Sequence, residues 1–106
     1  MNKYGNIKTM TFDGIKHDSQ KEANRWCELK LLQRAGKISE LERQVPFELI
    51  PKQDGERACT YVADFVYMEN GVKVVEDVKS KATRTESYKI KKKLMLWVHG
   101  IKIKET

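Results

Sequence analysis

Hydrophobic and polar positions in the first third of the chain repeat with the period of an amphipathic helix. Ser19 and Glu22 form a capping-box pattern, and Gly36 follows the last apolar position as a C-cap. The spacing predicts a helix over residues 19–35. We expect its buried face to carry Ala23, Trp26, Cys27, Leu31 and Leu32.

The middle of the chain changes to the β-branched and aromatic pattern of strands. Residues 59–68 and 72–78 flank a turn in which the pair Asn70-Gly71 favours a tight β-hairpin. Residues 44–50 predict a further strand, in which Pro46 favours an edge position or a bulge because proline lacks a backbone donor. We therefore expect three consecutive strands, two of them paired as a hairpin.

The last part of the chain predicts a second helix and a short strand. Thr83 with Glu86 offers another capping box, and Gly100 ends the helical pattern. Residues 101–104 then alternate as a strand. The apolar positions of this helix, which we expect in the core, are Ile90, Leu94 and Trp97.

A short β-ribbon is expected before the first helix, because residues 9–12 and 15–17 flank the turn dipeptide Asp13-Gly14. The predicted order is this ribbon followed by α-β-β-β-α-β, an α/β fold with a mixed sheet in the α+β sense. A length of 106 residues suits one domain, residues 1–106. The apolar share of 40% and the charged share of 34% exclude a disordered or collagen-like chain.

Charge is unevenly distributed along the chain. The net charge is +6, and residues 79–104 carry nine Lys or Arg against one acidic residue, Glu86. A basic segment suits a polyanion such as DNA, but basic residues on a helix are also typical of a solvated face. Both interpretations stay open for the candidate nucleic-acid contacts Lys81, Arg84, Lys89, Lys92 and Lys93.

The sequence predicts no membrane partner. Its longest apolar run, residues 94–98, is far shorter than the roughly 20 residues that span a bilayer, and residues 1–5 have no signal-peptide core. We expect a cytoplasmic protein in which Cys27 and Cys59 are small, unpaired core residues. His17 and His99 are isolated and receive no catalytic role.

Two carboxylates and a lysine on neighbouring strands are the strongest candidates for chemistry. Asp77 and Lys79 share one face of their strand because side chains alternate, whereas Glu76 faces the other side as a solvated or salt-bridged residue. Folding the hairpin about its turn places Asp64 opposite Asp77. A structural ion pair between Asp64 and Lys79 is the alternative.

The pair Asp64 and Asp77 has the chemistry of a metal site. Close carboxylates repel each other unless a cation lies between them, and hard oxygen ligands suit Mg²⁺ or Mn²⁺. Such an ion can activate water for attack on a phosphodiester and neutralise the charge that develops on the phosphoryl oxygens. Lys79 would hold the attacking water or stabilise the same charge.

These motifs resemble the PD-(D/E)xK nuclease superfamily, which includes restriction enzymes, Holliday-junction resolvases and phage endonucleases. Ala63-Asp64 is followed after twelve residues by Asp77-Val78-Lys79, within the predicted α-β-β-β-α-β order. Ala63 stands where the name-giving motif has proline, a change that the superfamily tolerates. Over residues 11–104 the chain looks like short phage-encoded nuclease-like proteins, through residues 18–22, 41–44, 61–65 and 75–80.

The resemblance implies a role for each matching residue. Asp64 and Asp77 would be metal ligands, Lys79 the catalytic lysine, and the Val78 carbonyl an additional ligand. Glu22 matches by position a glutamate that often completes such sites as a catalytic residue and metal ligand, although a helix cap alone also explains it.

The resemblance also implies the reaction, which is hydrolysis of DNA phosphodiester bonds with Mg²⁺ or Mn²⁺, on branched or replicating phage DNA. Gln44 would help position water or phosphate, or is a simple strand residue. One such domain makes one cut, so cutting two strands would require a homodimer. Two alternatives remain: a non-catalytic nucleic-acid-binding module on the same fold, and a structural or inhibitory protein that binds acidic host surfaces.

Overall fold

Four strands form one mixed sheet in the order β3-β4-β5-β6 in the computed structural model, which describes residues 8–106. β3 (Ser39–Ile50), β4 (Cys59–Glu69) and β5 (Val72–Asp77) are antiparallel, and β6 (Lys104–Glu105) pairs in parallel with β5. Asn70 and Gly71 have φ angles of 53° and 78°, the left-handed backbone that their tight turn requires. The predicted order of elements and the hairpin are confirmed.

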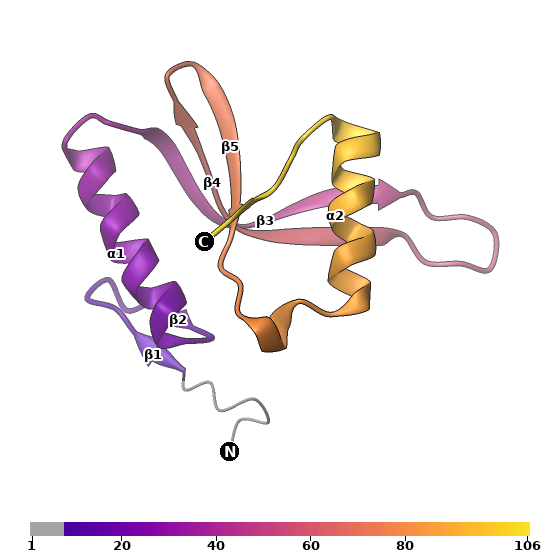
Figure 1. Ribbon diagram of the computed structural model, residues 1–106, viewed down its shortest axis with the longest axis horizontal. Coiled ribbons are helices and arrows are strands. Elements are labelled where there is room, and N and C mark those ends of the chain that lie inside the picture. Colours follow the sequence, from indigo (N-terminus) through magenta and orange to yellow (C-terminus); the bar gives the residue numbers. More distant parts are fainter. Residues whose placement is uncertain (1–7) are drawn as a thin grey trace.

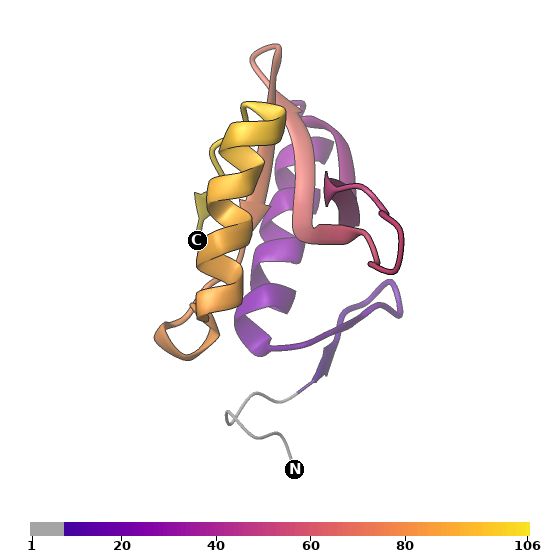
Figure 2. The same ribbon diagram turned by 90° about the vertical axis from the view of Figure 1, so that its right-hand side faces the viewer.

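Two helices lie on opposite faces of this sheet (Figures 1 and 2). α1 (Gln20–Arg34) packs against a core of Trp26, Leu29, Ile38, Phe65 and Tyr67, which we name the α1-side core. α2 (Glu86–His99) packs against the α2-side core of Leu49, Tyr61, Ala63, Val66, Val75, Tyr88, Met95 and Ile103. The fold is therefore a mixed α+β domain with one apolar core on each face of the sheet.

The β3–β4 ribbon bends at its middle, where the two cores meet (Figure 1). On β4, Tyr61 and Ala63 belong to the α2-side core, yet Phe65, two residues later, belongs to the α1-side core. Side chains two residues apart in a regular strand share a face, so the alternation breaks at Asp64. The facing residue on β3 is Gln44, which has a φ of 53°. This break in both strands exchanges the faces that they present to the helices.

The N-terminal ribbon is present but shorter than predicted. β1 (Thr9–Met10) pairs antiparallel with β2 (Lys16–His17). Gly14, at the turn, has a φ of 81°, which glycine adopts without strain. The ribbon leads directly into the first turn of α1, where Ser19 accepts a hydrogen bond from the Glu22 N–H as predicted.

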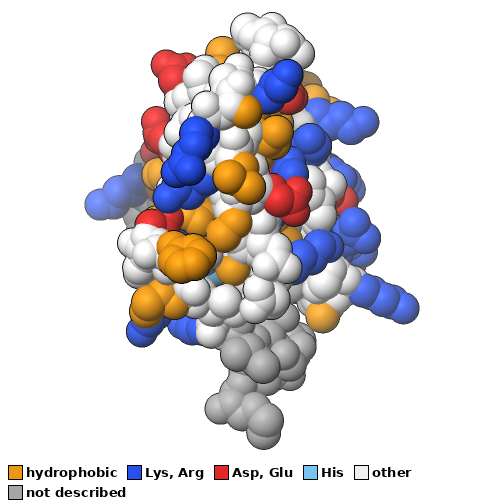
Figure 3. Space-filling model, turned by 90° about the vertical axis from the view of Figure 1, so that its left-hand side faces the viewer, with side chains coloured by type: hydrophobic (Ala, Val, Ile, Leu, Met, Phe, Trp, Pro, Cys, Tyr) orange, Lys and Arg blue, Asp and Glu red, His pale blue; other side chains and the backbone are white. Residues whose placement is uncertain are grey.

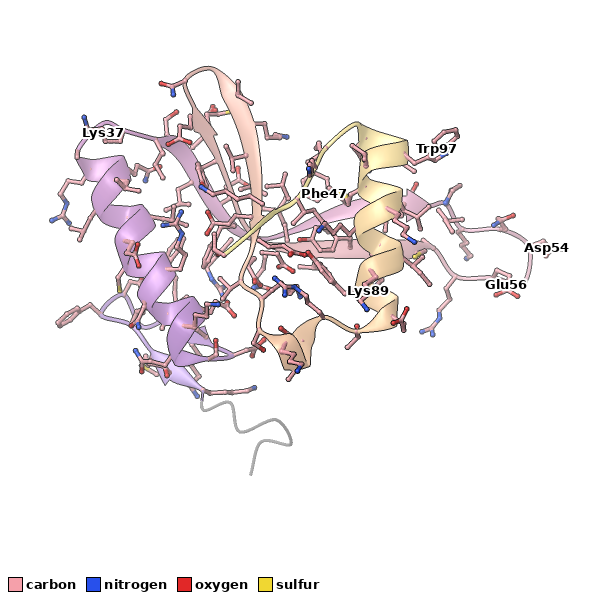
Figure 4. The ribbon with its side chains drawn as sticks, viewed as in Figure 1. Lys37, Phe47, Asp54, Glu56, Lys89 and Trp97 are labelled. Atoms are coloured by element: carbon pink, nitrogen blue, oxygen red, sulfur yellow. The ribbon has the colours of Figure 1, made fainter. Side chains whose placement is uncertain are left out.

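The start and the buried face of α2 differ from the prediction. Thr83 belongs to a short 3-10 helix, η1 (Lys81–Thr83), and Thr85 is the N-cap of α2, accepting from the Tyr88 N–H. Trp97 is 86% exposed and projects outward (Figure 4), because the helix buries Tyr88 and Met95 instead. Of the predicted stripe, Leu94 packs against the α2-side core, but Ile90 and Trp97 are exposed, because the spacing alone does not show which side of the helix faces the sheet.

Three further predictions are corrected by the structure. Cys27 and Leu31 are exposed and do not lie in the core, because α1 turns Trp26 and Leu29 inward. Figure 3 shows apolar side chains exposed on the side of the molecule where α1 lies in Figure 1. β3 begins at Ser39 rather than at residue 44, and it is an edge strand, as Pro46 indicated. β6 is displaced from residues 101–104 to Lys104–Glu105.

Cys59 is half-buried, and both cysteines are free, as expected. Neither helix within residues 8–106 is long and apolar enough to cross a membrane.

Candidate active site

Asp64 and Asp77 lie side by side where β4 and β5 meet the bend. The Val78 N–H donates to Asp64 Oδ2 at 2.8 Å, and the Asp64 N–H donates to Asp77 Oδ1 at 3.3 Å. The break in β4 at Asp64 frees its amide for this contact with a side chain. The two carboxylates are thus brought together, as the hairpin register predicted.

The electrostatics of the pair are unfavourable without a cation. Burial, followed by the charge of Asp77, raises the pKa of Asp64 to about 8. The charge of Glu22 acts in the same direction. The fold therefore holds acidic groups together although they repel each other.

Lys79 lies against Asp77. Its Nζ is 2.8 Å from Asp77 Oδ2, and its side chain is 13% exposed. The ammonium lies 3.9 Å from the ring centroid of Tyr88, so a cation–π contact from α2 holds it from the other side. The Lys79 N–H donates to the Thr106 carbonyl at 2.9 Å, which fixes the backbone beside β6. The structural alternative, a pair with Asp64, is replaced by a pair with Asp77.

Glu22 is buried in the first turn of α1 and does not cap the helix with its side chain. Its carboxylate lies 3.4 Å from His17 Nδ1, whereas its backbone N–H alone takes part in the cap with Ser19. Burial raises the pKa of Glu22, partly offset by the hydrogen bond from His17. The side chain of Glu22 is therefore not the helix cap, and its carboxylate lies against His17.

Glu76 faces the opposite side of β5, as strand parity predicted. It is fully buried and receives two hydrogen bonds from Arg25, at 2.6 and 2.9 Å, and one from Tyr67 Oη at 2.8 Å. Burial alone would raise the pKa of Glu76, but these hydrogen bonds outweigh it and lower the pKa. Glu76 is therefore a salt-bridged structural residue that joins α1 to the sheet.

The donor set fits a hard divalent cation in its chemistry. Asp64, Asp77 and Glu22 offer carboxylate oxygens, the ligands that Mg²⁺ and Mn²⁺ prefer. The Val78 N–H donates to Asp64, which places the Val78 backbone beside the pair. As they stand, no three His, Cys, Asp or Glu side chains within residues 8–106 are close enough to hold a metal.

Gln44 lies opposite Asp64 across the β3–β4 ladder and is exposed. Its left-handed backbone is uncommon for a residue other than glycine and costs on the order of 1 kcal/mol. The position fits either interpretation of Gln44, because the side chain is accessible and adjacent to the candidate site.

The basic residues predicted to contact DNA do not all have free charges. Arg84 and Lys92 both pair with Glu105, at 3.1 and 3.2 Å, and Lys89 pairs with Glu86 at 3.2 Å. Lys81 and Lys93 are exposed, and within the described part of the chain neither has an acidic partner. The cluster is therefore organised by two carboxylates rather than being uniformly basic.

Comparison with known proteins gives a family without an assigned activity. Residues 1–104 match a family described as a protein of unknown function, DUF1064. The chain belongs to this family. No curated protein and no solved structure matches it. The function of this DUF1064 protein has to be argued from its site.

Sequence reasoning missed three residues beside the site of this DUF1064 protein. His17 is 1% exposed and contacts Glu22, although it is isolated in the sequence. Tyr61 is 4% exposed, and its hydroxyl has no partner within the described residues. Arg43 acts on Glu22 through its charge, and its buried Nε is also without a partner. The burial of one isolated side chain leaves no periodic pattern in the sequence. Of the three residues, only Tyr61 lies on a strand of the predicted hairpin, so the hairpin offered a signal for Tyr61 alone.

Proposed function

We propose that this DUF1064 protein is a metal-dependent nuclease with a restriction-endonuclease-like core. The observation that carries the proposal is the joint geometry of Asp64, Asp77 and Lys79. Two carboxylates meet at the bend of a strand pair, and a lysine 2.8 Å from Asp77 stands beside them. Burying like charges costs free energy, and perturbed carboxylates that share a site are frequent in active sites.

Asp64 and Asp77 would hold a Mg²⁺ or Mn²⁺ ion, with Glu22 and the Val78 carbonyl as further ligands. When bound, the ion supplies activation of water and neutralisation of charge on a phosphoryl group. Burial, followed by the charge of Asp77, raises the pKa of Asp64, and a cation bound beside a buried carboxylate would favour its charged form, which supports this assignment.

Lys79 would be the group of the protein that moves during the reaction. In the free site it neutralises Asp77; once a cation takes over that role, the ammonium is released toward the phosphate. Water adds to phosphorus, one P–O ester bond breaks, and the leaving sugar oxygen takes up a proton. The products are a phosphomonoester and a sugar hydroxyl.

DNA is the proposed substrate, because basic residues follow Lys79 directly in the chain. Lys81 and Arg84 come next after the site, Lys89 and Lys93 are exposed on α2, and Lys92 is half-buried there. Such residues neutralise phosphates and position a strand without reading its sequence. One site per chain would make one cut, so a homodimer is proposed for cutting both strands.

A cleavage panel tests the proposal. Purified protein is incubated with linear duplex, single-stranded and four-way-junction DNA in Mg²⁺, Mn²⁺ or EDTA. We expect metal-dependent cleavage that falls at least about a hundredfold in Asp77→Ala and Lys79→Ala. Matched controls are Asp54→Ala and Lys37→Ala, which remove the same charges far from the site (Figure 4). No cleavage by the folded wild type, or undiminished cleavage by the site variants, would sink the enzyme proposal.

A non-catalytic nucleic-acid-binding module is the second candidate, and one observation favours it. The ion pair between Lys79 and Asp77 already satisfies one carboxylate, which a purely structural site would also require. This candidate predicts DNA binding that is insensitive to EDTA and to Asp64→Asn. Metal-dependent cleavage by the wild type would exclude it.

A further inference from the structure

A groove runs along α2 on the side that faces the C-terminal segment. It has a volume of about 430 Å³, within the range of pockets that hold small ligands. Lys89, Lys93 and Leu96 line it from α2, and Lys102 and Ile103 line it from the opposite side. Leu96 is 55% exposed, so the groove combines an accessible apolar floor with a basic rim.

The groove begins one side chain away from the candidate active site. Tyr88 lines the groove, and its ring also contacts the ammonium of Lys79 at 3.9 Å. The hydroxyl of Tyr88 donates to Glu105 at 2.7 Å, so the ring is held between the two places. A chain that passes the site at Lys79 would therefore meet the groove next.

Glu105 organises the positive charge of the groove. It pairs with Arg84 and Lys92, and the hydrogen bond from Tyr88 is the largest cause that lowers the pKa of Glu105. Lys93 and Lys102 have no acidic partner within residues 8–106. The groove therefore keeps unneutralised ammonium groups on its rim, which suit phosphate oxygens.

We infer that this groove receives one unpaired nucleotide of the substrate strand, next to the phosphodiester that is cut. The inference rests on the proposed function and makes it more specific. Lys93 and Lys102 contact the phosphate, and Leu96 with the exposed Ile90 packs against the base or sugar. A duplex keeps its bases stacked inside and cannot offer an apolar face to a groove of this size. The substrate class is therefore DNA with unpaired nucleotides, such as single strands, flaps or forks.

Binding measured in EDTA tests the inference without turnover. Fluorescence anisotropy of a labelled oligonucleotide, single-stranded or annealed to its complement, is recorded for the full chain at several salt concentrations. The groove variants are Lys93→Ala and Leu96→Ala, both at exposed positions. Their matched controls are Lys91→Ala and Trp97→Ala, which lie on α2 but outside the groove.

We expect Leu96→Ala to weaken single-strand binding about tenfold and to leave duplex binding unchanged. Lys93→Ala should reduce the salt slope of single-strand binding by about 0.7, whereas Lys91→Ala should reduce it less. Equal effects of the two lysine variants would overturn the inference, because they would indicate non-specific attraction. So would a larger loss in Trp97→Ala than in Leu96→Ala, which would place the strand on the outer face of the helix.

The groove and the nuclease can fail separately. If the wild type cleaves DNA but Leu96→Ala binds and cleaves single strands normally, the groove inference is overturned and the proposed function stands. If Leu96→Ala loses single-strand binding and the wild type never cleaves, the groove is a single-strand binding site and the proposed nuclease activity fails. A wild-type dimer on size-exclusion chromatography that Leu96→Ala abolishes would also overturn the inference, because a second copy would then fill the groove.

Discussion

Replacing Asp64 by asparagine separates the cost of the acidic pair from its packing. Asparagine has nearly the same shape, and its Oδ1 can still accept the hydrogen bond from the Val78 N–H, which is 2.8 Å long in the wild type. Its amide group can donate to Asp77, whose carboxylate lies beside it. We therefore expect Asp64→Asn to be more stable than the wild type in EDTA and to be inactive as a nuclease.

The size of the gain follows from the raised pKa of Asp64. The pKa rises from 3.8 to about 8 on folding, which corresponds to an upper limit of about 6 kcal/mol at 1.4 kcal/mol per pH unit. Because burial is the largest cause of this rise and a buried asparagine also loses hydration, we expect roughly 2–3 kcal/mol. The folded state binds the proton more tightly than the unfolded state. The contribution of Asp64 to the free energy of unfolding of the wild type is therefore most favourable below about pH 4, and it falls between about pH 4 and pH 8.

Urea unfolding at pH 4 and pH 8, with and without Mg²⁺, measures this directly. In EDTA the advantage of Asp64→Asn should be near zero at pH 4 and largest at pH 8. Saturating Mg²⁺ should remove most of it, since a ligand at a hundred times its Kd stabilises the wild type by about 2.7 kcal/mol. A variant that is less stable than the wild type at both pH values would refute the reasoning, because Asp64 would then be a stabilising partner.

Three further changes test other parts of the structure. Arg25→Ala should lower the free energy of unfolding in urea by about 3–5 kcal/mol, because it leaves Glu76 buried and unpaired; a loss below 1 kcal/mol would contradict this pairing. Gln44→Gly should relieve about 1 kcal/mol of backbone strain at a φ of 53° and so raise the melting temperature by about a few degrees, and a lower melting temperature would contradict the strain. Tyr61→Phe should raise the free energy of unfolding by about 1 kcal/mol, since its buried hydroxyl has no partner within the described residues; a loss would reveal a partner.

Local signals in the sequence predicted the elements well. The cap at Ser19 and the turn at Asn70-Gly71 are chemical features that act within a few residues, and both are present where predicted. The turn also set the register, and with it the meeting of Asp64 and Asp77. Properties that depend on a few neighbouring residues could therefore be predicted, including the core of the candidate site.

Other features depend on contacts between distant segments and carry no local signal. The bend at Gln44 and Asp64 reverses the faces of β3 and β4, but period-two alternation looks ordinary on either side of it. The burial of His17 beside Glu22 requires the ribbon to fold onto α1. The burial of Trp97 was predicted wrongly, because packing against the sheet decides which side of α2 is buried.

The bend in the β3–β4 ribbon also bears on how the molecule opens. Each core is covered by its own helix, and Phe65 and Tyr67 beyond the bend belong to the α1-side core, which is the arrangement expected of two cooperative folding units. Asp64 lies on the boundary, while Glu22 belongs to the unit of α1 and Lys79 is held by Tyr88 of the other. Transient opening of either unit would dismantle the site while leaving the other half folded. Amide hydrogen exchange would then report two protection levels that meet at residue 64.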